Sequence, residues 1–252
     1  MDLELINQLK LRYEQFFQEL EINKNGILGK ISNPRYQNEK LRFSGFPYIG
    51  TKYSMAKKKI LFIGLDIGED ELSCENTYHN FDSRRKVITG SVDGCSSLGF
   101  NNHISGTYIS AMFLLKNDYD WDKSWNSVCA FDNKTCKSVI DILKSSLPLE
   151  VLDYVAFTNI HKFVTVNRNN RTGDENRKWY NKNEEIDFLI DEIKIFNPDI
   201  VYFQGSSAKL NTEVINKINS ISDICIAPHP SSWRNNANKP TFNNQIIIRH
   251  KK

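Results

Sequence analysis

Three polar residues that could do chemistry each follow an apolar run of the sequence. They are Asp66, Asn159 and His229, in the segments GLDIG, FTNIHK and APHPS. A carboxylate and an imidazole can stabilise charge or move a proton, and a primary amide presents a donor and an acceptor in one plane. If the apolar runs are strands of one parallel sheet, these side chains meet beyond its carboxyl edge, where open α/β sheets bind ligands.

Strand-length apolar runs alternate with amphipathic segments along the chain. This alternation is typical of parallel strands joined by helical crossovers. It predicts an α/β fold, a three-layer α/β/α sandwich with a central, mostly parallel four-stranded sheet. The predicted strands are Ile60–Leu65, Val151–Thr158, Ile200–Phe203 and Ile224–Ala227, and the predicted helices are Leu3–Ile22, Ser105–Leu115, Thr135–Ser146, Glu184–Phe196 and Leu210–Ile218.

The chain of 252 residues is expected to form one globular unit. Residues 59–252 form the α/β domain in this prediction, and residues 1–58 supply an N-terminal helix and a connecting segment packed on it. The segment Asn23–Lys59 carries Gly, Pro, Asn and scattered aromatic residues without a clear period, which favours a long connection.

Composition excludes several classes of protein. The longest unbroken apolar run, Ala111–Leu115, is far too short to cross a bilayer, so no membrane association is expected. The polar N-terminus does not resemble a secretory signal, which favours a cytoplasmic location. Five irregularly spaced cysteines predict neither a disulfide framework nor a metal site, and the pair Cys129 and Cys136 lacks a second pair for an iron–sulfur cluster. We therefore expect no metal and no cofactor.

The three segments, in this order, resemble the motifs of the uracil-DNA glycosylase superfamily over roughly Lys59–Arg234. GLDIG resembles the first motif, with Asp66 at its water-activating position and Ile67 in place of the usual proline. FTN resembles the element in which an asparagine reads the edge of the base, and HPS at His229 matches the final motif. The segment NNHISG, at residues 101–106, resembles a wall of the base pocket in some branches.

The resemblance implies a DNA glycosylase that hydrolyses the bond between a flipped-out base and its deoxyribose. Asp66 would stabilise positive charge on the sugar and activate water, and His229 would stabilise the departing base. Substrate binding would involve Asn159, Gly64, Gly68, Phe100 and His103. DNA contacts would come from Ser231, Ser232, Trp233, Arg234, Lys162, Arg168 and Arg171. The expected partner is DNA, bound by a monomer. The net charge is only +3, so phosphate contacts must come from such local clusters.

Each of these residues also has a structural interpretation. Asp66 could cap a turn, His229 could belong to a proline-flanked turn, and Trp233 could pack in the interior. Ile67 does not fix its backbone angle as proline does, which leaves open a binding module without turnover. A hydrolase of free nucleosides or nucleotides is a further alternative.

The predicted substrate is uracil or a pyrimidine enlarged at C5. Uracil-specific relatives carry tyrosine where this chain has Gly68, and that ring blocks a C5 substituent. Its absence would leave room for a modified cytosine, such as those of phage DNA.

Overall fold

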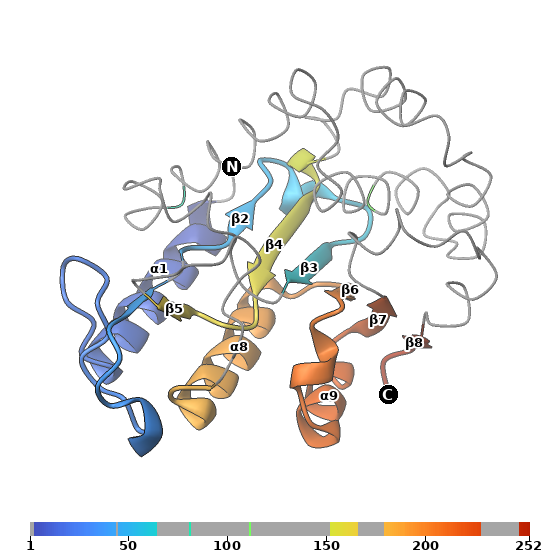
Figure 1. Ribbon diagram of the computed structural model, residues 1–252. Helices are drawn as coiled ribbons and strands as arrows, with labels where there is room; N and C mark the ends of the chain where they lie inside the picture. Colours follow the sequence, from blue (N-terminus) through green and yellow to red (C-terminus); the bar gives the residue numbers. More distant parts are fainter. Residues whose placement is uncertain are drawn as a thin grey trace, which may run out of the picture.

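The computed structural model describes residues 3–43, 45–64, 81, 111, 152–165, 179–227 and 247–252. In this part of the chain the protein is a mixed α/β structure with a mostly parallel sheet (Figure 1). Its α-helices are α1 (Leu3–Glu19), α8 (Lys182–Phe196) and α9 (Thr212–Asn219), and its short 3-10 helices are η1 (Pro34–Tyr36), η2 (Tyr53–Met55) and η3 (Ser207–Lys209).

The main sheet has the strand order β2-β4-β3-β6-β7-β8 (Figure 1). The four central strands pair in parallel, which confirms the predicted mostly parallel sheet. Antiparallel β2 and β8 extend it to six strands in the described part of the chain, so the predicted number of four is too low. The bounds are β2 (Tyr48–Ile49), β3 (Ile60–Gly64), β4 (Val155–Asn159), β6 (Ile200–Gln204), β7 (Asp223–Ala227) and β8 (Ile247–Arg249).

The N-terminal connection contains more structure than the sequence indicates. Besides β2 it holds β1 (Leu41–Phe43), which pairs antiparallel with β5 (Phe163–Thr165) in a separate two-stranded sheet. Gly50, which follows β2, lies against backbone carbonyl oxygens of Leu152 and Asp153, where a Cβ atom would clash. The segment is therefore built into the domain by strand pairing and by close backbone packing.

Capping residues mark the end of α8 and the start of α9. Asn197 ends α8 in the left-handed conformation, with φ 45°, directly before Pro198. Asn211 starts α9 because its side chain accepts a hydrogen bond from the Val214 amide at 2.9 Å, so the helix begins after the predicted Leu210. No helix within the described ranges is long and apolar enough to cross a membrane.

Two predicted helices fall almost entirely outside the described ranges, and one strand starts later than predicted. The predicted helices Ser105–Leu115 and Thr135–Ser146 lie outside the described residues, apart from Ala111, which is helical and buried. The predicted strand Val151–Thr158 begins only at Val155, because Leu152 and the residue after it are helical.

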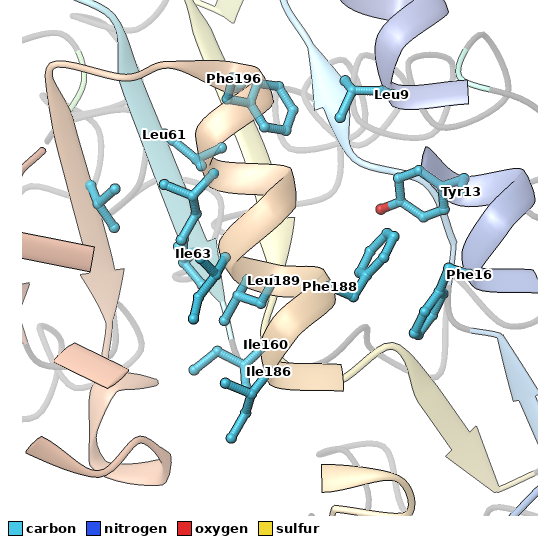
Figure 2. Close-up of a cluster of buried hydrophobic side chains, with 14 of the residues drawn as sticks. Leu9, Tyr13, Phe16, Leu61, Ile63, Ile160, Ile186, Phe188, Leu189 and Phe196 are labelled. Atoms are coloured by element: carbon cyan, nitrogen blue, oxygen red, sulfur yellow. The ribbon is translucent and has the colours of Figure 1, made fainter. Parts of the chain in front are cut away.

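The larger hydrophobic core lies between the sheet and its helices. α1 packs on α8, and α8 packs on β3 (Figure 2). The Phe16 and Phe188 rings stack with centroids 4.0 Å apart, which joins the two helices. The labelled side chains of this cluster are Leu9, Tyr13, Phe16, Leu61, Ile63, Ile160, Ile186, Phe188, Leu189 and Phe196.

The opposite face of the sheet is buried as well. Phe62 of β3 packs there between Phe157 of β4 and Tyr202 of β6, at centroid distances of 5.3 and 4.8 Å. Leu152 and Ala111 belong to the same cluster. Burial on both faces explains why the parallel strands read as continuous apolar runs rather than alternating ones.

Candidate functional site

The carboxyl edge of the parallel strands carries the predicted site residues that the structure describes. Gly64 is the last residue of β3, and Asn159 is the last residue of β4. Lys162 follows β4 by three residues. The other predicted site residues lie outside the described ranges: Asp66, Gly68, Phe100, His103, Arg168, Arg171, His229, Ser231, Ser232, Trp233 and Arg234.

Gly64 and Asn159 are direct neighbours across the β3–β4 pair. A Cβ atom built on Gly64 would lie 2.5 Å from Oδ1 of Asn159, so the amide occupies the space that any other side chain would fill. Asn159 itself is half-buried. The glycine therefore permits the amide to lie across the end of β3, and the structure brings these two predicted residues together.

The end of β6 adds residues that sequence reasoning missed. In the strand order, β6 lies between β3 and β7, so its end is in the middle of the carboxyl edge. Gln204 ends β6, and Gly205 and Ser206 follow. Because the segment QGSS is polar and follows an apolar run, the signal was present in the sequence. The sequence does not show where β6 lies in the sheet. The strand order places it between β3 and β7, which are therefore about 10 Å apart, or two strand spacings.

Lys162 has a different place from the predicted one. Its side chain is 1% exposed, and Nζ lies 2.7 Å from Oε2 of Glu192, which is fully buried. The same ammonium donates to Oγ1 of Thr158 at 2.7 Å, and Thr158 donates to Glu192 at 2.8 Å. This burial argues against the predicted DNA contact of Lys162, which is an interior residue whose charge is neutralised by a carboxylate of α8.

The N-terminal helix completes this buried network. The Tyr13 hydroxyl donates to Oε1 of Glu192 at 2.5 Å, so both carboxylate oxygens have partners. The Lys162 ammonium also lies 5.5 Å from the ring centroid of Phe188. One buried ion pair therefore connects α1, α8 and the end of β4. Glu192 carries no motif, and its position on a mostly apolar helix face is the sequence signal for it.

A second buried carboxyl lies at the start of α8. Glu185 is fully buried, and its Oε1 accepts hydrogen bonds from the backbone amides of Tyr180 and Asn181 at 3.1 and 2.9 Å. Its Oε2 has no hydrogen-bond partner among the residues that the structure describes. Burial raises the pKa of Glu185 to about 7, although backbone hydrogen bonds and the charge of Lys162 act in the opposite direction. This carboxyl is therefore half-protonated near neutral pH.

Glu185 should make the stability of the protein fall with rising pH. Its pKa rises from 4.5 in the unfolded chain to about 7 in the folded one. Between these values the folded state holds one more proton, so stability decreases as the pH rises and levels off above about 7. The Glu185→Gln variant should gain roughly 3 kcal/mol over the parent at pH 8 and almost nothing at pH 4.5, as measured by urea unfolding.

The neighbouring Glu184 offers a matched control for this experiment. Its half-buried side chain reaches solvent, so Glu184→Gln should leave the difference between pH 4.5 and pH 8 unchanged. If the free energy of unfolding changed with pH in the same way for the parent and for Glu185→Gln, the raised pKa of Glu185 would be contradicted.

The described residues of the edge thus offer amides, a glycine and a serine rather than a metal site. Within the described ranges, no three His, Cys, Asp or Glu residues are grouped so as to hold a metal ion. The chemistry available from these residues is hydrogen bonding to a planar polar ligand. No family model matches the chain, and no curated protein or solved structure was found to be similar to it.

Proposed function

We propose that the chain is a DNA glycosylase, which hydrolyses the N-glycosidic bond of a flipped-out uracil or C5-modified pyrimidine and leaves an abasic site. The observation that carries this proposal is the Asn159 amide lying across Gly64, at the carboxyl edge of a parallel sheet. An amide in this position can pair with the donor and acceptor of a pyrimidine edge. The motif order in the sequence supports the same reaction.

The proposed catalytic residues closely follow strand ends in the sequence. Asp66 is two residues beyond Gly64, and His229 is two residues beyond Ala227, the last residue of β7. The proposed roles are water activation and sugar-charge stabilisation for Asp66, and stabilisation of the departing base for His229.

The proposal includes a three-layer α/β/α arrangement. Side chains of α8 and α9 share one buried cluster with one face of the sheet, and α1 packs on α8. The other face is buried too, and the helical residue Ala111 belongs to its cluster. A second helical layer over that face would account for both observations.

The test is formation of abasic sites, detected by cleavage with alkali. Purified protein is incubated with DNA containing uracil and with phage DNA containing modified cytosines. Asp66→Asn and His229→Ala should each lower the excision rate on the order of 100-fold, because each removes a group that stabilises charge in the transition state. The matched controls are Asp187→Asn on the exposed surface of α8 and His250→Ala, whose side chain is 83% exposed.

Excision of one base, lost in both variants and kept in both controls, would establish the activity and identify the base. Unchanged DNA after incubation with a protein that still binds it would leave a recognition module in place of an enzyme.

A further inference from the structure

The side chain of Asn181, the residue before α8, bonds the N-terminal connection. It is completely buried, and it makes no capping hydrogen bond to α8, every residue of which the structure describes. Its Oδ1 accepts a hydrogen bond from the Ser32 amide at 2.6 Å, and its Nδ2 donates to the Lys30 carbonyl at 2.9 Å. An asparagine at a helix start usually bonds its own helix, whereas this one joins two segments that are about 150 residues apart in the sequence.

Two further contacts strengthen this attachment. Asn33 donates its backbone amide to the Tyr180 carbonyl at 3.1 Å and its side-chain amide to the Trp179 carbonyl at 3.3 Å. The rings of Tyr36 and Tyr180 meet edge to face, with centroids 5.3 Å apart. Residues 30–36 are therefore attached to residues 179–181 by both backbone and side-chain contacts, which together are called the N-terminal contact below.

Glu185 fixes the α8 side of the N-terminal contact. Its carboxyl is fully buried, and Oε1 accepts hydrogen bonds from the backbone amides of Tyr180 and Asn181, two of the residues that hold the connection. Oε2 has no hydrogen-bond partner within the described ranges. An ionised carboxylate in this place lacks part of the hydrogen bonding that water would give it. Loss of the proton therefore favours any rearrangement that admits water to the carboxylate.

The charged groups around Glu185 offset this cost only in part. The Lys162 ammonium lowers the pKa of Glu185, but it is itself paired with Glu192. Burial outweighs this effect and raises the pKa of Glu185 to about 7. Other titratable side chains on the surrounding elements are His161 after β4, Lys30 and Tyr36 of the connection, and Tyr180 and Glu184 beside Glu185 itself. Because histidine also titrates in this range, the effect of His161 has to be separated from that of Glu185.

We propose that Glu185 is a pH-sensitive switch: ionisation of its carboxyl loosens the N-terminal contact, so that residues 30–36 separate from residues 179–181 more often at pH 8 than at pH 5.5. This inference does not depend on the proposed reaction. Opening gives the carboxylate access to water, so its pKa returns from about 7 toward 4.5. The closed state then holds more protons than the open state between these values, and rising pH favours opening. The opening equilibrium should increase by up to roughly 25-fold between pH 5.5 and pH 8.

Amide hydrogen exchange of the full chain tests this inference. The amides of Ser32 and Asn33 donate across the contact. Their protection factors, corrected for the intrinsic exchange rate at each pH, should fall by up to roughly 25-fold between pH 5.5 and pH 8. The amides of Leu28 and Phe43 donate within the connection itself, so their protection should change much less. An equal fall at all four amides would indicate general unfolding and would overturn the inference.

A variant assigns the pH dependence to one group. Glu185→Gln keeps a hydrogen-bond acceptor but cannot ionise, so the protection of Ser32 and Asn33 should no longer depend on pH. Glu184→Gln is the matched control and should behave like the parent. A fall that persists in Glu185→Gln would assign the pH dependence to another group, such as His161, and would also overturn the inference. The comparison of amides within the parent needs no variant, so it decides the question even if Glu185→Gln does not fold.

Discussion

Replacing Lys162 with methionine is expected to lower the free energy of unfolding by about 3 to 5 kcal/mol, because it leaves the Glu192 carboxylate buried without its cation. The remaining Tyr13 and Thr158 hydroxyls donate to this carboxylate but carry no positive charge. Both members of the ion pair are almost fully buried, so water cannot replace the lost partner. Urea unfolding followed by circular dichroism measures the effect.

An exposed ion pair on α8, the helix that carries Glu192, provides the matched control. Lys194 lies 3.2 Å from Asp191, and both side chains are at least 40% exposed. Lys194→Met should therefore cost less than about 1 kcal/mol. The double variant Lys162→Met/Glu192→Leu should recover most of the stability lost in the single variant, because no buried charge remains. Equal effects of the two lysine substitutions would refute the assigned role of the buried pair.

Under the proposed function, Gly64→Ala is expected to lower base excision on the order of 100-fold or more while the protein stays folded. The added Cβ takes the place of the Asn159 amide oxygen, only 2.5 Å away, and the short side chain must rotate. A displacement of about 1 Å in a binding group is sufficient for a rate loss of this size. The free energy of unfolding should change by less than about 1 kcal/mol, since no backbone atom is crowded. Single-turnover excision and urea unfolding measure the two quantities.

A double-mutant cycle separates this cause from others. In an Asn159→Ala background, Gly64→Ala has no amide left to displace, so it should add little to the loss of activity. Independent, multiplicative effects of the two substitutions would show that Gly64 acts by another route.

The parallel strands could be located along the sequence, because strands that are buried on both faces are continuous apolar runs. The edge strands could not. β2 has two residues and β8 has three, and their pairing depends on distant partners such as Phe157 and Ile224. A segment of two or three residues is too short to show the hydrophobic periodicity that distinguishes a strand from a loop.

The positions of candidate site residues could be predicted only where a motif coincides with a strand end. Gly64 and Asn159 met this condition, and the register brings them together. Lys162 does not lie at a strand end. Its position shortly after Asn159 gives no sign of Glu192, the carboxylate 30 residues later that neutralises its charge. Gln204 was missed because the position of β6 between β3 and β7 is a property of the sheet and not of the local sequence.

The contact between α1 and α8 has a consequence for the growing chain on the ribosome. α1 ends at residue 19, whereas the helix that covers Tyr13 and Phe16 ends at residue 196. At about 5 to 20 residues per second, the apolar face of α1 waits roughly 10 to 35 s for its partner. During that time it is a surface to which a chaperone could bind, and the native core cannot close until the chain has been synthesised as far as residue 196, the end of α8.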